Sequence, residues 1–459
     1  MTKKVKAKLN VHKTAPSARG IAVEILNRIE LSGAYAEPLL DSCLSGNNII
    51  NRQDKGLITE LVYGTLRNRN KLDWAIAKIY TGNFDSMEIP VRNILRTGIY
   101  QLLNTDRIPP FAAVNEAVEI ARNIRPAASG LVNAVLRNTI RKKDSIIWPD
   151  LAGDVISAIS VNYSHPAWIV ERWRELYGVE ATIAICRANN EIPPLTVRVN
   201  TLKTSRTNMI STLKNEGVAA APTLFSPEGI VISDNSAGLR ETDAFRQGLI
   251  RVQDEASQLV AHLLAPQPGE QVLDFCAGAG GKALHLAALM QNSGEITAVD
   301  INRTKLNQLM AEANRLGVTI VRIVQGDGAG KNTVISKMFD RVLVDAPCSG
   351  LGTLRRNPEI RWRLTGPDIF ALQQKQRNLL SNAAERVRPG GSLAYCVCTT
   401  TPEETEEIVA DFLKSDNRFK LSPPPNLSSE IVTADGFLRT FPHRHSLDGF
   451  FGAVFTKNT

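Results

Sequence analysis

The sequence has no long apolar run, no metal-type pairing of its cysteines and no apolar core in its basic first residues. No apolar stretch approaches the roughly 18 residues that cross a membrane, and the opening MTKKVKAKLNVHK lacks the apolar core of a signal peptide. No CxxC spacing relates the six cysteines, which are Cys43, Cys186, Cys276, Cys348, Cys396 and Cys398. We therefore expect a cytoplasmic protein with reduced thiols, no membrane partner and no bound metal.

The positive charge of the 459-residue chain is unevenly placed. Residues 1–143 hold 22 lysines and arginines against 12 acidic residues, whereas the remaining 316 residues hold 32 against 34. A basic module joined to a near-neutral one is typical of nucleic-acid enzymes, because neutralising phosphates supplies affinity that does not depend on sequence. A solvated helical face with surplus lysine fits the charge equally well.

Apolar periodicity divides the chain into three parts. Residues 1–143 repeat a helical spacing, as in ARGIAVEILNRI at 18–29, and predict an all-α bundle of five to seven helices. Residues 144–250 mix two helical patterns with short β-branched runs, which predicts a small α/β domain. Residues 251–459 alternate apolar runs of strand length with helical segments. This alternation predicts an α/β domain with a doubly wound, mostly parallel sheet.

A glycine-rich turn, CAGAGGK at 276–282, follows the first strand run of the last domain and opens a helix. Its glycines let the backbone approach a ligand closely, and the helix N-terminus favours polar or anionic groups. Asp300, Asp327 and Asp345 end the next three strand runs, so their carboxylates fall along one edge of the sheet, with Asp300 where ribose hydroxyls commonly bind. Strand-end aspartates also cap the helices that follow them. Three in register after a glycine turn favour a nucleoside-binding site.

Two cysteines fall at neighbouring strand ends beside this site, Cys348 in DAPCSG and Cys398 in LAYCVCTT. Carbon 5 of cytosine or uracil is too weakly nucleophilic to take a methyl group from S-adenosylmethionine unaided, and a thiolate added to carbon 6 activates it. Asp345 is placed to hydrogen-bond the polar edge of the ring and to stabilise the activated base. The thiol pair therefore predicts group transfer through a covalent intermediate.

These motifs resemble a known family. DAPCSGLGTLRRNPEIRWR (345–363) and GGSLAYCVCTTTPEE (390–404) resemble the paired cysteine motifs of the RNA (cytosine-5)-methyltransferases, and best match the bacterial 16S ribosomal RNA methyltransferase B type, also called Sun or Fmu. RVQDEASQLV (251–260) and DGFFGAVF (448–455) are similar to that family, and GLITELVYGTLRN resembles its NusB-like RNA-binding domain. The resemblance implies a Rossmann-like methyltransferase domain, S-adenosylmethionine as cofactor and 16S ribosomal RNA as partner. We expect the protein to be a monomer.

The resemblance also implies roles for individual residues. The family's nucleophile maps onto Cys398, and its assisting cysteine, which helps to release the product, maps onto Cys348; Asp345 completes the catalytic set. The implied cofactor-binding residues are Cys276, Ala277, Gly278, Ala279, Gly280, Gly281, Lys282, Asp300, Asp327 and Asp345. The chain departs from the family pattern at Ala279, where proline is usual.

The motifs also contain a run of cationic residues and an additional cysteine. The cationic run of Arg355, Arg356 and Arg361 with Trp362 predicts contacts to phosphates. Cys396 is expected to be a small packing residue. A zinc ion held by Cys348, Cys396 and Cys398 with a histidine, His443 or His445, is disfavoured, because a metal would quench the nucleophile.

Two other functions stay open from the residues alone. An NAD-type oxidoreductase would share the nucleotide fold, although it would not explain a second strand-end cysteine. An RNA-binding or antitermination factor would use the helical module and would need neither thiol.

Overall fold

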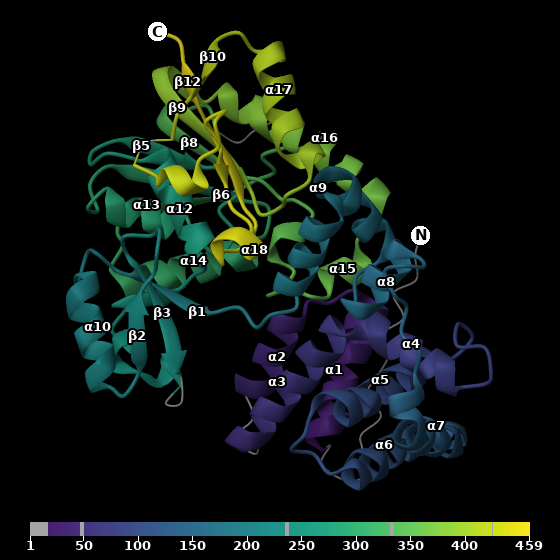
Figure 1. Cartoon of the computed structure of the whole chain (residues 1–459). Helices are drawn as coiled ribbons and strands as arrows, with labels where there is room; N and C mark the ends of the chain where they lie inside the picture. The colour runs from purple at the N-terminus through teal and green to yellow at the C-terminus, as the bar shows by residue number, and fades with distance from the viewer. Residues whose placement is uncertain (1–16, 46–49, 235–237, 331–334, 425) are drawn as a thin grey trace. The chain divides into compact units, whose positions relative to one another are not determined.

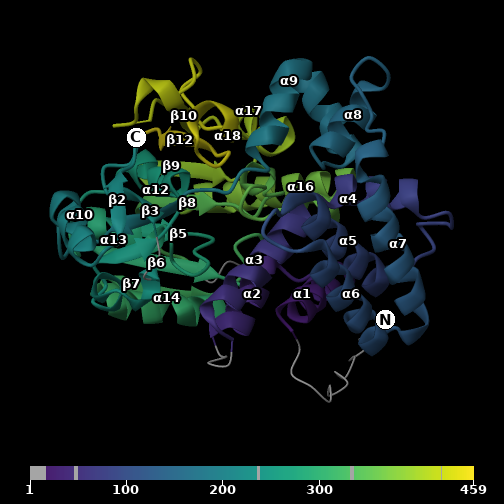
Figure 2. The ribbon, with the colours of Figure 1, turned by 60° about the horizontal axis from the view of Figure 1, so that its bottom comes forward.

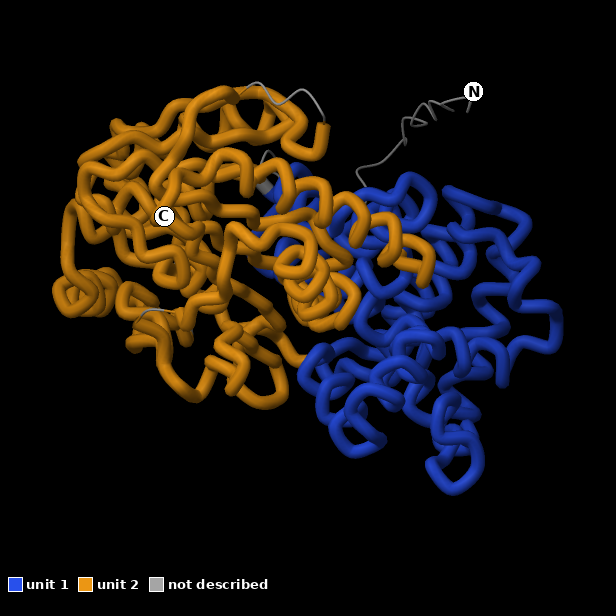
Figure 3. The backbone as a smooth tube through the Cα atoms, turned by 90° about the horizontal axis from the view of Figure 1, so that it is seen from above, with its two compact units in different colours: residues 1–190, 357–363 blue, residues 191–356, 364–459 orange. Residues whose placement is uncertain are grey.

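A computed structural model describes residues 17–45, 50–234, 238–330, 335–424 and 426–459. Backbone contacts divide the chain into two compact units, shown in Figure 3. The helical unit comprises residues 1–190 and 357–363, and the α/β unit comprises residues 191–356 and 364–459. Within the described residues, no helix has both the length and the apolar character of a membrane span.

The helical unit contains α-helices throughout (Figure 1). In the described residues these are α1 (Ala18–Ser32), α2 (Ala36–Ser45), α3 (Arg52–Arg67), α4 (Arg69–Ile79), α5 (Ile89–Asn104), α6 (Pro110–Ile124), α7 (Ser129–Lys142), α8 (Val155–Asn162), α9 (Ala167–Ala188) and α15 (Ile360–Arg363). Helices α1 to α7 confirm the predicted all-α bundle over the first part of the chain.

Local signals set the ends of these helices. The Ser17 side chain accepts a hydrogen bond from the Gly20 amide and caps α1, and Gly33 ends that helix in the left-handed region, with φ at 66°. Asn51 caps α3 in the same way, accepting from the Asp54 amide. Pro110 stands at the first position of α6, where the helix needs no amide donor.

The α/β unit begins with a small antiparallel sheet in the order β2-β3-β1-β4. Its strands are β1 (Leu195–Val199), β2 (Ala219–Pro222), β3 (Gly229–Asp234) and β4 (Ile250–Val252), and its helices are α10 (Arg206–Asn215) and α11 (Asp243–Arg246). The predicted small α/β domain is confirmed, although β2 was not foreseen, because AAAP carries no β-branched residue.

The larger sheet has the order β10-β12-β9-β8-β5-β6-β7, with β11 paired to β12. Its strands are β5 (Gln271–Asp274), β6 (Glu295–Asp300), β7 (Val321–Gln325), β8 (Phe339–Asp345), β9 (Val387–Val397), β10 (Phe419–Ser422), β11 (Leu438–Arg439) and β12 (Phe451–Lys457). Strands β5 to β9 pair in parallel, and β10 to β12 add antiparallel strands beside β9. The doubly wound, mostly parallel sheet is thereby confirmed.

Helices cover both faces of this sheet (Figures 1 and 2). Strand residues alternate between the two apolar cores, as the period of two requires: Leu343 and Cys396 join one core, whereas Val344 and Tyr395 join the other. The first core contains residues of α12 (Glu255–Leu264), α13 (Ala283–Leu289) and α14 (Arg303–Leu316). The second contains residues of α16 (Gly366–Ala384) and α17 (Glu406–Ser415).

Candidate active site

The carboxyl ends of the parallel strands share one edge of the large sheet. The strand order reverses at β5, which lies between β6 and β8, and open α/β sheets bind their ligands at such a switch point. Asp300 ends β6, Asp345 ends β8, and Cys398 directly follows β9. The predicted acidic and thiol residues therefore belong to one edge of one sheet.

The glycine turn after β5 has the backbone that its sequence predicts. Gly278 and Gly280 have φ values of 55° and 82°, which favour glycine. A Cβ on Gly280 would also lie 2.5 Å from Leu309 Cγ. The Gly278 amide donates to Asp300 Oδ2 over 2.9 Å, so one predicted cofactor-binding residue holds another in place.

The remaining predicted cofactor residues surround this turn. The Ala277 amide bonds the Val299 carbonyl over 2.8 Å, which ties the turn to β6. Cys276 is half-buried, and burial followed by the Asp274 charge raises the pKa of its thiol. Asp327 lies beyond the end of β7, where its Oδ1 accepts from the Ala329 amide over 3.0 Å.

Lys282 closes the glycine turn and forms an ion pair with Asp345. Its Nζ lies 2.6 Å from Asp345 Oδ2. Burial lowers the pKa of Lys282, but the Asp345 carboxylate, together with weaker contributions from other acidic groups, holds that pKa above its usual range. The charge of Cys398 acts in the same direction, so a thiolate at Cys398 and the Lys282 ammonium stabilise each other. A fixed cation thus lies within the electrostatic reach of the predicted nucleophile.

The two predicted thiols meet. Cys348 Sγ and Cys398 Sγ are 3.3 Å apart, within hydrogen-bonding distance for sulfur. The hydrogen bond with Cys398, and then burial, raise the pKa of Cys348 well above its ordinary value. The raised pKa favours the protonated form of Cys348, which can donate this hydrogen bond to the Cys398 sulfur.

Glu404 holds the two thiol-bearing loops together, a role that the sequence did not indicate. Its buried carboxylate accepts from the Ser349 amide over 2.8 Å on the Cys348 side. It accepts from the Thr401 hydroxyl over 2.8 Å on the Cys398 side. The Gln376 amide adds a third bond, 3.0 Å long. Both loops are thus fixed to one carboxylate.

Asp274 is a second residue that sequence reasoning missed. It ends β5, immediately before the glycine turn, and its side chain is buried at the same sheet edge. Burial, followed by the charge of Asp345, raises the pKa of Asp274 to about 7. Asp274 could have been predicted from the sequence, because it is an aspartate at the end of a strand run, as are Asp300 and Asp345.

Two arginines of the small sheet bind carbonyl groups of the glycine turn. Arg198 Nη1 donates to the Gly281 carbonyl over 2.9 Å, and Arg251 Nη2 donates to the Ala279 carbonyl over 3.0 Å. Arg251 belongs to the RVQDEASQLV segment, whose function the sequence left open. The small sheet therefore helps to position the turn.

The predicted phosphate contacts of the cationic run are wrong. Arg356 pairs with Asp448 Oδ2 at 2.7 Å and with Asp254 Oδ2 at 2.5 Å, and Arg355 also pairs with Asp448. These bonds join three family-like segments inside the α/β unit. The charges of the two arginines are neutralised by buried carboxylates instead of being presented to a nucleic-acid backbone.

The end of the same run is built into the helical unit. Arg361 is fully buried and donates to the carbonyls of Ser164 and Asn189 over 3.0 and 3.1 Å. The Trp362 indole N–H donates to the Leu66 carbonyl over 2.8 Å. Both side chains satisfy backbone acceptors, which is a structural role.

Cys396 is fully buried in the core beneath α12 and α13. Its sulfur lies where a Cβ on Gly452 of β12 would approach to 3.4 Å. This placement agrees with the expectation that Cys396 packs.

Comparison with known proteins identifies the family. The model of the 16S rRNA methyltransferases RsmB/F matches residues 261–456, the NusB family model matches residues 16–141, and a ferredoxin-like domain of RsmF/B-like methyltransferases matches residues 165–237. A "Probable ribosomal RNA small subunit methyltransferase B" of Bacillus subtilis is 36% identical over 95% of this chain and 97% of its own. The chain belongs to the ribosomal RNA small subunit methyltransferase B family.

Other members and solved structures agree with this placement. A ribosomal RNA small subunit methyltransferase B of Salmonella typhi is 33% identical over 88% of this chain and 91% of its own. The crystal structure of PH0851 covers 97% of this chain and 100% of its own, with a TM-score of 0.82 and 29% identity. A methyltransferase homologue from Pyrococcus horikoshii covers 66% and 98%, with a TM-score of 0.58 and 30% identity. The chain is an rRNA methyltransferase of this family, which removes the oxidoreductase and the non-enzymatic binding factor from consideration.

Proposed function

We propose that this enzyme transfers a methyl group to carbon 5 of a cytosine in 16S ribosomal RNA through a covalent adduct with Cys398. The 3.3 Å contact between the Cys348 and Cys398 sulfurs, at the sheet edge that holds the glycine turn, carries this proposal. Two thiols in contact serve a reaction that both forms and breaks a carbon–sulfur bond.

S-adenosylmethionine would supply an electrophilic methyl group at this edge. The residues present fit such a molecule: the glycine turn brings backbone close to a ligand, and Asp300 lies where ribose hydroxyls bind. Asp274 offers a buried carboxylate at the end of β5 for the cofactor's amino group. These residues would bind and orient the cofactor.

Cys398 forms the adduct. Its thiolate adds to carbon 6 of the cytosine, and the electron pair of the ring's 5,6 double bond becomes available at carbon 5. Asp345, held by Lys282 at 2.6 Å, hydrogen-bonds the polar edge of the ring and stabilises the charge that develops there. Carbon 5 would then take the methyl group, and the bonding electron pair would stay on the donor sulfur, which leaves as a neutral thioether.

Cys348 acts on the second half of the reaction. Once Cys398 is bonded to carbon 6, it no longer hydrogen-bonds Cys348 as a thiol or thiolate, and the largest cause of the raised Cys348 pKa is removed. Cys348 then gives up its own proton to solvent, and the resulting thiolate accepts the proton of carbon 5. Loss of that proton re-forms the double bond and expels the Cys398 thiolate.

The substrate base must leave its stack to reach the sheet edge, so the target lies in a single-stranded loop or is flipped out. The excess of basic residues in 1–143, 22 against 12, supports RNA binding by the helical module, because phosphate neutralisation supplies affinity.

Bisulfite sequencing of 16S ribosomal RNA from a strain that lacks this protein tests the proposal. We expect one 5-methylcytosine to disappear, and to return with the wild-type gene but not with Cys398→Ala. An unchanged 16S methylation pattern would show that the substrate lies elsewhere.

A further inference from the structure

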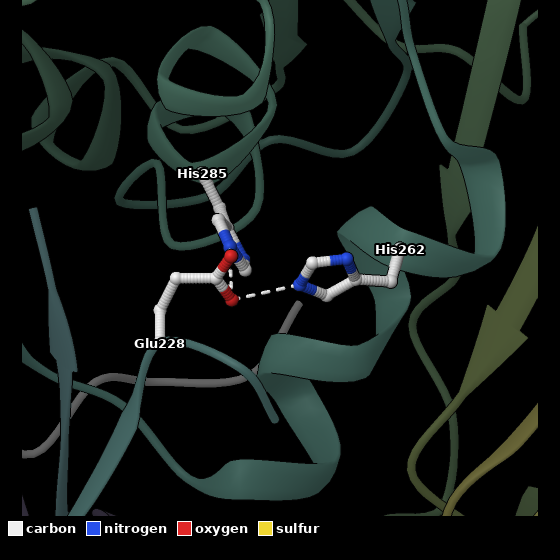
Figure 4. A group of neighbouring side chains, drawn as sticks. All are labelled: Glu228, His262 and His285. Carbon is white, nitrogen blue, oxygen red and sulfur yellow. Dashed lines mark hydrogen bonds and ion pairs between the residues drawn. The ribbon is translucent and has the colours of Figure 1, made fainter. Parts of the chain in front are cut away.

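A group of two histidines and one glutamate lies in the α/β unit, away from the thiol pair. Glu228 immediately precedes β3, His262 lies on α12 and His285 lies on α13. Figure 4 shows both imidazole rings directed at the Glu228 carboxylate. His262 Nε2 is 2.8 Å and His285 Nε2 is 3.6 Å from Glu228 Oε2, and the three ligand atoms all lie within 4.8 Å of one another.

His285 lacks the partner that a buried polar ring normally has. It is 1% exposed, and neither of its ring nitrogens forms a hydrogen bond with any described residue. A neutral imidazole has one ring nitrogen with a free lone pair, which is the atom that binds a metal ion. A buried, unpaired imidazole costs free energy unless something binds it.

We propose that Glu228, His262 and His285 form a binding site for a divalent transition-metal cation of the zinc class. Zinc–ligand bonds of about 2.0–2.2 Å in a tetrahedral arrangement place neighbouring ligand atoms about 3.3–3.5 Å apart. The two distances to Glu228, 2.8 and 3.6 Å, bracket that spacing, and side-chain rotations would bring the three ligand atoms, which lie within 4.8 Å of one another, into place. Two imidazoles and one carboxylate favour zinc and its neighbours over magnesium or calcium, which prefer oxygen ligands. Water would complete the coordination.

Charge sets the expected strength of this site. One carboxylate neutralises half of the charge of a dication, while the buried Arg198 guanidinium opposes it. Binding should therefore be weaker than at structural zinc sites with several thiolates. The cysteine spacing of the sequence predicts no metal, and Glu228, His262 and His285 stand at unrelated positions that form no ligand motif.

A bound cation would join three segments around the cofactor turn. Glu228 precedes a strand of the small sheet, His262 lies on a helix under the large sheet, and His285 follows Lys282 by three residues. A ligand that binds only the folded chain stabilises it by mass action. The site would thus stabilise the junction of the two sheets at the start of α13.

The competing explanation is a hydrogen-bonded cluster in which His262 donates to Glu228 and no metal binds. His262→Gln separates the two, because glutamine keeps an N–H donor for Glu228 but is a poor zinc ligand. His443→Ala is the matched control, since His443 is a half-buried histidine outside the cluster.

The test titrates chelator-treated, full-length protein with zinc and with cobalt. The same titrations use the Cys348→Ala/Cys398→Ala double variant, because thiolates as a class are zinc ligands. We expect one ion per chain, cobalt absorption typical of nitrogen and oxygen ligands, and a zinc-dependent rise in Tm, all shared by His443→Ala and the double variant. Loss of even an outer-shell partner costs a metal site about 10–100-fold in affinity, so His262→Gln should bind at least about tenfold more weakly.

Melting without metal shows whether each variant is folded, and Glu228→Gln provides a second disrupted ligand. Equal zinc affinity in wild type and both ligand variants would overturn the proposal. So would a thiolate–cobalt absorption band that disappears in the double cysteine variant together with the binding.

Discussion

The α/β unit holds two groups of reactive side chains that the chain assembles in different ways. At the sheet edge, Asp274, Asp300 and Asp345 end parallel strands, and the thiols of Cys348 and Cys398 lie in the loops that follow. The Glu228–His262–His285 cluster instead draws one residue from a strand entry and two from separate helices. The carboxyl ends of parallel strands lie along one edge of the sheet, so residues that end such strands in the sequence are expected to form one site. Helix positions far apart in sequence imply nothing until the packing is known.

The largest expected effect distinguishes a cysteine that reacts, Cys398, from one that only packs in the core, Cys396. Cys398→Ala should abolish methyl transfer and every covalent adduct, because no group remains to add to carbon 6. Transfer from radiolabelled S-adenosylmethionine to 16S RNA measures this. Cys396→Ala, two residues earlier and buried in the core, is the matched control and should keep its activity. Activity lost only in Cys396→Ala would mean that Cys396 is the nucleophile and that the assignment to Cys398 lies two residues too late.

Cys348→Ala should fail at a later step. The variant keeps the nucleophile, so it should add and methylate, and then stall before the carbon 6–sulfur bond breaks. A protein–RNA band that survives a denaturing gel would report the stalled adduct. If Cys348→Ala loses the adduct and Cys398→Ala retains it, the two roles are reversed.

Asp300→Ala should weaken binding of S-adenosylhomocysteine by about 1–3 kcal/mol, which is the cost of leaving the ligand's polar groups without their hydrogen bonds. The carboxylate also holds the Gly278 amide, so the turn itself loses a support. Calorimetric titration measures the change, with Asp411→Ala, on the outer surface of α17, as the control. Unchanged affinity would remove Asp300 from the site.

Asp274 gives the most pH-dependent effect. Its folded-state pKa, about 7, lies above its unfolded value near 3.8, so the folded state holds this proton more tightly. Its contribution to stability is therefore present at low pH and is lost as pH rises from about 4 to about 7, by on the order of 4 kcal/mol. Asp274→Asn should remove that dependence.

Denaturant unfolding of the cofactor-free protein at pH 5 and pH 8 provides the comparison for Asp274. Asp274→Asn should be more stable than wild type at pH 8, and this difference in the free energy of unfolding should be smaller at pH 5. Parallel pH profiles for the two proteins would mean that the Asp274 carboxyl titrates normally.

The sequence predicts the backbone of the sheet edge well because its signals are local. Strand runs, glycine turns and strand-end acids each occupy a few consecutive residues, and the positions of Asp300, Asp345 and both thiols follow from them. Asp274 carries the same signal and was foreseeable. The antiparallel strand β12 was harder, since its run was noticed only as a family-like segment.

Pairings across long sequence separations could not be predicted. Arg356 bonds Asp254 and Asp448, which are 102 and 92 residues away, and this pairing turns a predicted phosphate contact into an internal one. Glu404 likewise joins two loops whose contact depends on strand order. Charge in a sequence shows that a partner is needed, but only the fold decides whether the partner is RNA or protein.

Trapping with RNA that carries 5-fluorocytosine at the target tests the central claim most directly. Elimination requires a base to remove a proton from carbon 5, and a fluorine atom at that position cannot be removed in this way. The adduct therefore persists after methyl transfer. Peptide mass mapping of the trapped wild-type enzyme should find the nucleotide on Cys398. A nucleotide attached to Cys348, or the absence of any covalent complex, would contradict the account.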